Sequence, residues 1–162
     1  MTLSPAISIY PTRDPALINA IMRSPDVFDG STDDSVQDPM SIDITVLIDR
    51  WVFLCVEMAS EVVGVIVAIV KDLGVVYEVH TLLTAKCRGK NAIRAGREVA
   101  KWFFTNTPCQ RLESYCFSDC PAAKFFARAV GFTMGESTPN PSTRHGKPVD
   151  LIHCFLAKPI NI

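Results

Sequence analysis

The chain has 162 residues, a net charge of −1, 48 % hydrophobic residues and 20 % charged residues. A chain of this length can bury roughly 70 % of its unfolded surface in one core, and this composition excludes an intrinsically disordered or fibrous protein. The longest apolar stretch, residues 62–70, is about half of the ~20 residues that a membrane-crossing helix needs, and residues 2–9 lack the basic start of a secretory signal. We therefore expect a single cytoplasmic domain over residues 1–162, with no membrane partner.

The start of the chain predicts a strand followed by a short helix. Residues 8–10 suit a strand that ends at Pro11. Asp14 can cap a helix that has Pro15 in its first turn, and apolar residues then recur at helical spacing as far as residues 24–25. The Ser-Pro pair at that point is expected to stop the helix.

The middle of the chain predicts an acidic connection and then strands. Residues 28–40 are acidic and rich in Ser, Asp, Gly and Pro, which predicts a loop or a mobile helix-turn segment. Residues 42–48 fit the spacing of a strand and of a helix equally well. Two stretches rich in Val, Ile and Phe, residues 51–58 and 62–71, predict a hairpin, and a further strand is expected over residues 75–83.

The second half of the chain alternates helices and strands. Apolar residues between positions 92 and 103 fall on one helical face, and residues 105–108 end that helix at a proline. A strand is expected over residues 111–117. This order of elements indicates an α+β domain with a β-loop-α-β-α segment at its centre, where the chemistry is expected.

The last helix has signals at both ends. Asp119 is expected to cap its start, and the Gly-Phe pair at residues 131–132 predicts a left-handed C-terminal cap. Two strands over residues 133–136 and 149–156 follow, and a loop rich in Pro, Asn, Ser and Gly is expected to join them.

Six cysteines are scattered through apolar segments, which predicts reduced, buried thiols in a chain that needs no disulfides. They are Cys55, Cys87, Cys109, Cys116, Cys120 and Cys154. The sequence has no CxxC pair near a histidine that would complete a tetrahedral zinc set, so no metal site is expected.

Charge is distributed unevenly along the chain. Residues 26–49 carry seven aspartates and no lysine or arginine, whereas residues 86–101 carry six basic residues against Glu98 alone. One interpretation is an acidic surface for cations and a basic surface for anions; the other is that both runs are solvated surface. Nucleic acid is not favoured as a partner, because the basic run lacks interleaved aromatic residues and the isoelectric point is about 6.3.

Residues 83–93 join a strand to a helix through a small basic loop. Such a turn directs several backbone N–H groups and the positive end of a helix at one point, which predicts a site for an anion, most simply a phosphate. The spacing is neither that of a P-loop nor that of a dinucleotide-binding turn.

At the basic loop the sequence resembles the GNAT superfamily of acyl-CoA N-acyltransferases. That family has an apolar strand end five positions before an [RQ]xxGx[GA] loop, and Leu83 and residues 88–93 fall at the corresponding positions, with Arg88 at the first position of the loop pattern. Its later helix that ends in Gly-Phe is matched by residues 119–132. The resemblance covers residues 75–136 and implies a mixed, mostly antiparallel sheet that is splayed between strands 4 and 5, with helices on both faces. Residues 77–92 also resemble stand-alone GNAT proteins of bacteriophage and prophage genomes.

The resemblance implies an N-acetyltransferase that moves an acetyl group from acetyl-CoA directly to an amine. The basic loop would bind the phosphates of coenzyme A, and the backbone at the strand end would polarise the thioester carbonyl. The acceptor would be an amine-bearing small molecule or a protein amine, and a homodimer is compatible with the resemblance. The implied cofactor-binding residues are Leu82, Leu83, Arg88, Gly89, Lys90, Asn91, Ala92, Ile93, Cys120 and Phe126.

An amine must be neutral to attack a thioester, so a base is expected close to the acceptor. Glu78 and His80 alternate onto one face of the strand that ends at Leu83, and either could be that base. The alternatives are that Glu78 is a strand-edge carboxylate paired with Arg111 or a neighbour, and that His80 is a hydrogen-bonded structural histidine.

Departures from the family pattern keep a second function open. Asn91 and Ile93 stand where the loop usually has small residues, Cys120 replaces the usual asparagine, and Ala127 stands where many members place a proton-donating tyrosine. The second function is a degenerate, non-catalytic GNAT module that binds coenzyme A or a protein partner, such as a virion-associated phage protein.

The acidic run leads to an expectation about the acceptor. In the GNAT layout, the first helix and the segment after it form one wall of the acceptor cleft, and residues 139–148 form another. Seven aspartates in that wall would favour a positively charged amine. The alternative is that they form a solubilising loop.

Overall fold

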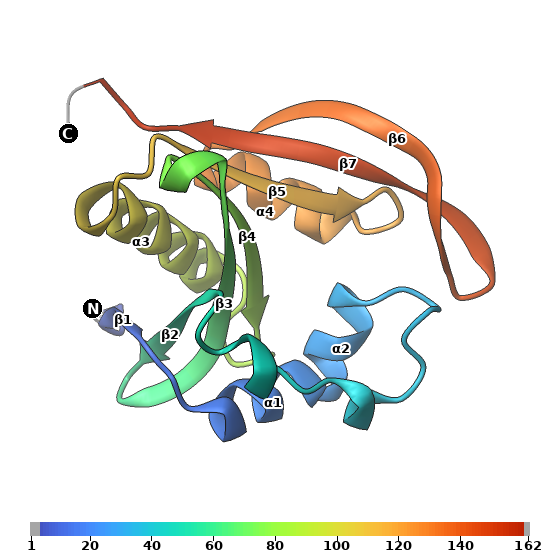
Figure 1. Cartoon of the computed structure of the whole chain (residues 1–162), viewed down its shortest axis with the longest axis horizontal. Helices are drawn as coiled ribbons and strands as arrows, with labels where there is room; N and C mark the ends of the chain where they lie inside the picture. The colour runs from blue at the N-terminus through green and yellow to red at the C-terminus, as the bar shows by residue number, and fades with distance from the viewer. Residues whose placement is uncertain (1–3, 161–162) are drawn as a thin grey trace.

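A computed structural model describes residues 4–160, and in this part of the chain seven strands form one sheet in the order β1-β2-β3-β4-β5-β7-β6 (Figure 1). Neighbouring strands are antiparallel except for β4 and β5, which are parallel. The strands are β1 (Ile7–Pro11), β2 (Val52–Met58), β3 (Glu61–Lys71), β4 (Val76–Leu83), β5 (Arg111–Phe117), β6 (Thr133–Arg144) and β7 (Lys147–Ala157). This α+β fold with a mostly antiparallel sheet confirms the predicted fold class.

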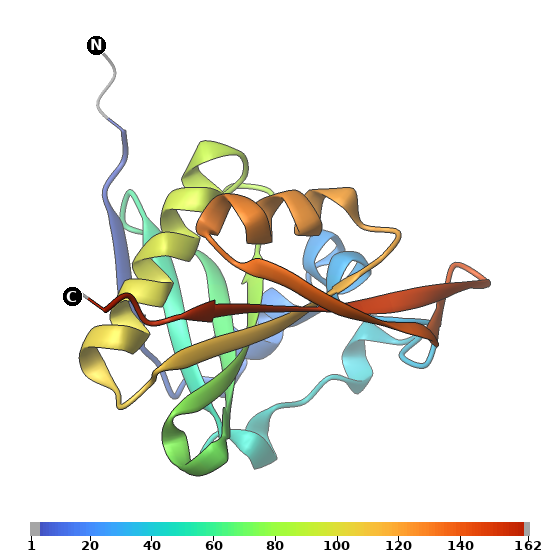
Figure 2. The same cartoon turned by 90° about the horizontal axis from the view of Figure 1, so that it is seen from above.

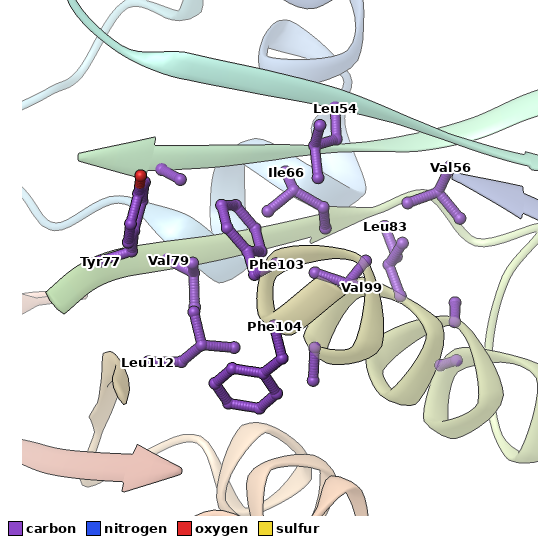
Figure 3. Packing of buried hydrophobic residues seen from close by; sticks show 14 of the residues in the cluster. Leu54, Val56, Ile66, Tyr77, Val79, Leu83, Val99, Phe103, Phe104 and Leu112 are labelled. Carbon is purple, nitrogen blue, oxygen red and sulfur yellow. The ribbon is translucent and has the colours of Figure 1, made fainter. Parts of the chain in front are cut away.

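Helices cover both faces of the sheet. They are α1 (Pro15–Arg23), α2 (Pro25–Ser31), α3 (Lys90–Asn106) and α4 (Pro121–Val130). Side chains of β3 alternate between two cores: Ile66 packs with Phe103 of α3, whereas Val65 packs with Ile18 of α1. Figure 3 shows the larger core, in which Phe103 and Val99 lie against the central strands. None of the helices over residues 4–160 has the length and apolar character to cross a bilayer.

The expected splay of the sheet lies between β4 and β5. The two strands pair only at Val76, Tyr77 and Glu78 and then diverge (Figure 1). At the fork, the Ser114 hydroxyl donates a hydrogen bond of 2.7 Å to the carbonyl of Val79. Beyond this point β4 has a strand partner on its β3 side alone, so the edge that faces β5 is open.

Of the two alternatives for the acidic connection, a loop or a helix-turn segment, the structure has helical turns, in α2 and at Pro39–Ser41. Ser24 and Pro25 do end α1, but Pro25 also starts α2, because a proline at a first helical position has no N–H that needs a partner. The ambiguous residues 42–48 contain a short 3₁₀ turn at Thr45–Leu47 rather than a strand.

The predicted loop between the last two strands is wrong. β6 and β7 continue as a long hairpin to a two-residue turn, where His145 and Gly146 both have positive φ (52° and 72°). The prolines of β6 are tolerated because it is an edge strand, and irregularities in its register with β7 absorb residues between Met134 and Ser142. Figure 2 shows how far this hairpin extends from the rest of the sheet.

The two ends of α4 differ in how well they were predicted. At the C-terminal end, Gly131 has φ 122°, and the N–H groups of Gly131 and Phe132 both donate to the carbonyl of Ala127, which confirms the predicted cap. At the N-terminal end the prediction is wrong, because Cys120 is the cap residue and makes no side-chain hydrogen bond. The Asp119 carboxylate instead accepts a hydrogen bond of 2.7 Å from Arg144.

Candidate active site

A cleft opens where β4 and β5 diverge. It has two lobes with volumes of about 350 and 380 Å³, a size typical of ligand sites. The inner lobe contains Glu78 and His80, and the outer lobe contains Arg88 and Ile93. The residues that line both lobes come from α2, from β4, from α4 and from the cap residue before α4: Gly30, Ser31, Thr81, Leu82, Cys120, Ala123 and Phe126.

In the inner lobe the two candidate bases contact each other. Strand alternation places Glu78 and His80 on one face, and Nε2 of His80 lies 3.0 Å from Oε1 of Glu78. The other carboxylate oxygen lies 2.9 Å from Nζ of Lys71. Arg111, the partner considered for Glu78 in the sequence, lies against Glu113 instead, with Nε 3.0 Å from Oε1.

Glu78 is mostly buried, with 14 % of its side chain exposed, while 40 % of His80 is exposed. Burial raises the pKa of Glu78, but hydrogen bonds from Lys71 and His80 outweigh it and hold that pKa below its ordinary value. The carboxylate is therefore charged at neutral pH and can accept a hydrogen bond from an N–H at Nε2 of His80. That arrangement leaves Nδ1 of His80 free to accept a proton from elsewhere.

The outer lobe is built on the basic loop. Gly89 has φ 59°, a conformation that favours glycine, and α3 begins directly after it. The first turn of this 17-residue helix has no side-chain cap, so its N–H groups remain available to an anion.

The structure brings most of the implied cofactor-binding residues into the cleft. Those that line it are Leu82, Leu83, Arg88, Gly89, Ala92, Ile93, Cys120 and Phe126. Lys90 and Asn91 are not among the lining residues; Lys90 is exposed beside the loop, and the Asn91 side chain faces Arg94. Ile93 brings a branched side chain to a position where the family pattern has a small residue.

Asp26 lies in the site, and the sequence did not indicate it as a site residue. Its carboxylate accepts a hydrogen bond from the backbone N–H of Ala85 in the basic loop, and Oδ2 lies 3.6 Å from Nη2 of Arg88. Nη1 of Arg88 donates to the carbonyl of Leu83 at 2.5 Å. The sequence showed Asp26 only as the first member of an acidic run.

Several aspartates of the acidic run stabilise local structure instead of facing the cleft as free charges. The Asp34 carboxylate accepts hydrogen bonds from the N–H groups of His145 and Gly146, at 2.8 and 2.9 Å, and so caps the hairpin turn. Asp33 accepts a 2.8 Å bond from the hydroxyl of Ser142, and Asp38 caps a 3₁₀ turn. The two expected walls therefore contact each other, and Asp33 and Asp34 are engaged in holding them together.

A buried arginine completes this contact and was also missed. The Arg144 side chain is 6 % exposed, and its guanidinium donates to the carbonyl groups of Asp29 and Thr32 and to the Asp119 carboxylate. It lies 4.6 Å from the centre of the Phe117 ring. Arg144 thus joins the hairpin tip to α2 and to the loop before α4.

The cysteines are free thiols, and five of the six are buried. Cys120 is half-buried and lines both lobes, while Cys116 and Cys154 line the inner lobe. Among residues 4–160, no group of three or more His, Cys, Asp or Glu side chains is arranged to hold a metal ion.

No protein-family model and no curated protein sequence matches this chain. Solved structures do match it over nearly its whole length. Spermidine N-acetyltransferase from Vibrio cholerae, in complex with CoA and spermine, is similar with a TM-score of 0.75 and 13 % identity, over 93 % of this chain and 95 % of that chain. A putative phosphinothricin N-acetyltransferase is similar with a TM-score of 0.75 and 16 % identity, over 94 % and 98 %. The chain has the GNAT fold.

A third similar structure has the same fold with a different ligand. The Microcin C7 self immunity acetyltransferase, in complex with acetyl-CoA and AMP, has a TM-score of 0.70 and 15 % identity, over 94 % of this chain and 92 % of that chain. The GNAT fold implied by residues 75–136 is therefore confirmed, together with the splay that opens the cleft.

Proposed function

We propose that the chain is an acetyl-CoA-dependent N-acetyltransferase that transfers the acetyl group directly to an amine. The observation that carries this proposal is the Glu78–His80 pair, which lies in the same cleft as the open edge of β4 and the basic loop. A proton acceptor, a strand edge and an anion site in one cleft are the parts that acetyl transfer needs.

The residues present fit coenzyme A. The open edge of β4 near Leu82 and Leu83 offers backbone groups that can hydrogen-bond to an extended chain such as pantetheine. Arg88, Gly89 and the first turn of α3 offer a guanidinium and N–H groups for phosphates, with the charge of Lys90 and the side chain of Asn91 close by. Ala92, Ile93, Cys120 and Phe126 form the apolar walls of the cleft.

Acetyl-CoA, when bound, supplies the acetyl group as a thioester that a neutral amine can attack. The chain's own part is proton transfer and polarisation. Nδ1 of His80 accepts the proton of the incoming ammonium, directly or through water, and the charged Glu78 carboxylate stabilises the resulting imidazolium through Nε2. Backbone N–H groups at the open edge of β4 polarise the carbonyl.

A non-catalytic coenzyme A-binding or protein-interaction module is the second candidate. The observation that favours it is Ala127, which lines the inner lobe where many GNAT members have the tyrosine that protonates the leaving thiolate. In the proposed enzyme, water takes the place of that tyrosine. A protein of this kind encoded by a phage would act in the host cytoplasm, on a small-molecule or protein amine, and a homodimer is compatible with it.

The two candidates are separated by measuring binding and turnover together. We expect calorimetry to show binding of acetyl-CoA. In an assay with a panel of amines, we expect the enzyme to release free coenzyme A thiol only with those amines that serve as acceptors. Glu78→Gln is expected to bind acetyl-CoA as the wild type does and to lose turnover. Glu113→Gln is the matched control, because Glu113 lies opposite Glu78 on β5 but does not line the cleft. Binding without turnover for any amine would favour the non-catalytic module.

A further inference from the structure

Asp26 connects α2 to the basic loop at the outer lobe of the cleft. Its carboxylate accepts the Ala85 N–H and lies 3.6 Å from Arg88. We propose that Asp26 is an internal anion that occupies the phosphate-binding loop and must be displaced when a phosphate-bearing ligand binds. This inference rests on the proposed function for the identity of that ligand as acetyl-CoA.

Arg88, one of the groups expected to hold the ligand, is engaged inside the chain, and so is the neighbouring N–H of Ala85. Arg88 donates to the carbonyl of Leu83 at 2.5 Å and contacts Asp26, and the Ala85 N–H is bonded to the same carboxylate. A phosphate group needs the same donors that a carboxylate uses. Binding of a phosphate at Arg88 therefore exchanges one anion for another instead of filling free donors.

The contact with Asp26 is one that a ligand can replace. The Asp26 side chain is 36 % exposed and Arg88 is 51 % exposed, so water reaches both and the ion pair is weak. A pyrophosphate carries more charge than one carboxylate, so the exchange favours the ligand. Asp26 thereby selects strongly charged phosphate ligands over single carboxylates.

The position of Asp26 links the exchange to the inner lobe. Asp26 is in the first turn of α2, and Gly30 and Ser31 at the other end of this helix line both lobes. Arg144 holds the carbonyl of Asp29 in the same helix. Val27, next to Asp26, is buried, and Arg144 holds the Asp29 carbonyl, so α2 stays in place when Asp26 is released. The exchange therefore changes the charge beside the residues that line both lobes.

Asp26→Asn tests the proposal, because an amide keeps an oxygen for the Ala85 N–H and removes the charge. We expect coenzyme A to bind the variant about two- to five-fold more tightly than the wild type, the range of an exposed ion pair. The dependence of binding on salt is expected to be steeper, because Arg88 then meets the phosphates without an internal competitor. Pantetheine, which lacks phosphates, is expected to bind both proteins equally.

Asp29→Asn is the matched control, since it makes the same charge change on the same helix, where Asp29 faces His145. It is expected to leave coenzyme A affinity unchanged. Weaker or unchanged binding by Asp26→Asn would overturn the proposal, and weaker binding would indicate that Asp26 positions Arg88 for the ligand.

Binding of inorganic pyrophosphate to the wild type and to Asp26→Asn tests the role of Asp26 independently of the proposed function. If the wild type binds pyrophosphate and Asp26→Asn binds it more tightly, the proposal for Asp26 is supported even when coenzyme A does not bind. In that case the proposed cofactor is wrong. If neither protein binds pyrophosphate or coenzyme A, the inference and the proposed function both fail. Melting curves of the three proteins without ligand verify that each is folded.

Discussion

The two lobes of the cleft differ in how their key groups are held. In the inner lobe, Glu78 and His80 are two residues apart on one strand and contact each other at 3.0 Å. In the outer lobe, the basic loop is contacted by Asp26, which is 59 residues away in the chain. The first arrangement follows from strand geometry, whereas the second exists only because α2 packs beside the loop.

This difference suggests separate roles for the two lobes: proton transfer in the inner lobe and ligand binding in the outer lobe. Glu78 of the inner pair is mostly buried and is bonded to His80 and Lys71, so its charge state changes little when a ligand enters the outer lobe. The outer lobe is more exposed and holds an internal anion, so its state depends on the ligand. Variants of the inner lobe should therefore act on turnover, and variants of the outer lobe on affinity.

The largest effect is expected in the inner lobe. Glu78→Gln and His80→Ala should each lower kcat by about 10²- to 10⁴-fold, the usual contribution of a positioned base, and leave the Kd of acetyl-CoA unchanged. Because the two side chains act as a unit, the double variant should be no slower than the slower single variant. Steady-state kinetics with matched binding data measure this. Effects that multiply in the double variant would show that the two residues act independently.

The next effect concerns stability and not the reaction itself. Arg144→Ala removes hydrogen bonds to two carbonyl groups and to Asp119 and leaves these acceptors partly buried, so we expect the free energy of unfolding to fall by about 2–3 kcal/mol. Denaturant titration measures the change. Lys147→Ala, an exposed residue in the same hairpin, is the control and should change stability by less than about 0.5 kcal/mol. A silent Arg144→Ala would mean that the hairpin tip is not anchored through this side chain.

Removing the charges of the outer lobe should weaken binding. Arg88→Ala with Lys90→Ala is expected to raise the Kd of coenzyme A about ten-fold, because charge-assisted contacts to phosphates are lost. The loss should be larger at low salt and should shrink as salt screens these exposed charges. Calorimetry at two salt concentrations measures it, and kcat at saturating acetyl-CoA should be nearly unchanged. A lower kcat at unchanged affinity would reverse the assignment of the two lobes.

A smaller effect tests whether the acidic run recognises the acceptor. Asp34→Asn keeps one acceptor oxygen but weakens the cap on the His145–Gly146 turn, so the free energy of unfolding should fall by about 1 kcal/mol. The KM for an amine acceptor should stay the same, because this carboxylate faces the hairpin turn. A raised KM with unaltered stability would restore the expectation that the acidic segment attracts cationic amines.

The smallest effect is a dependence of stability on pH. The pKa of Glu78 is held below its ordinary value of 4.5, so its contribution to stability is present above that value and is lost as pH falls through the lowered pKa of the folded state. Glu78→Gln should therefore flatten the acid side of the stability profile. Thermal melts across that range, compared with those of Glu113→Gln, measure the difference.

Much of the fold could be predicted from local sequence patterns. The positive φ values at Gly89 and Gly131 and the alternation of β4 each depend on residues within a few positions of one another. Two errors have the same origin: Asp119 looks like a helix cap and residues 137–144 look like a loop when only their neighbours are considered. Asp119 is instead bonded to Arg144, and residues 137–144 pair with β7 as an edge strand.

The sequence by itself determined the order of the strands and of α1, α3 and α4, the basic loop, and the placement of Glu78 and His80 on one face, because each of these depends on spacings of two to four residues. Only the tertiary structure decided which partners the charged side chains take. Arg144 reaches Thr32 across 112 residues, and Asp26 reaches Ala85 across 59. Such pairs leave no periodic signal in the chain, because they depend on how helices and hairpins pack against the sheet once both have formed.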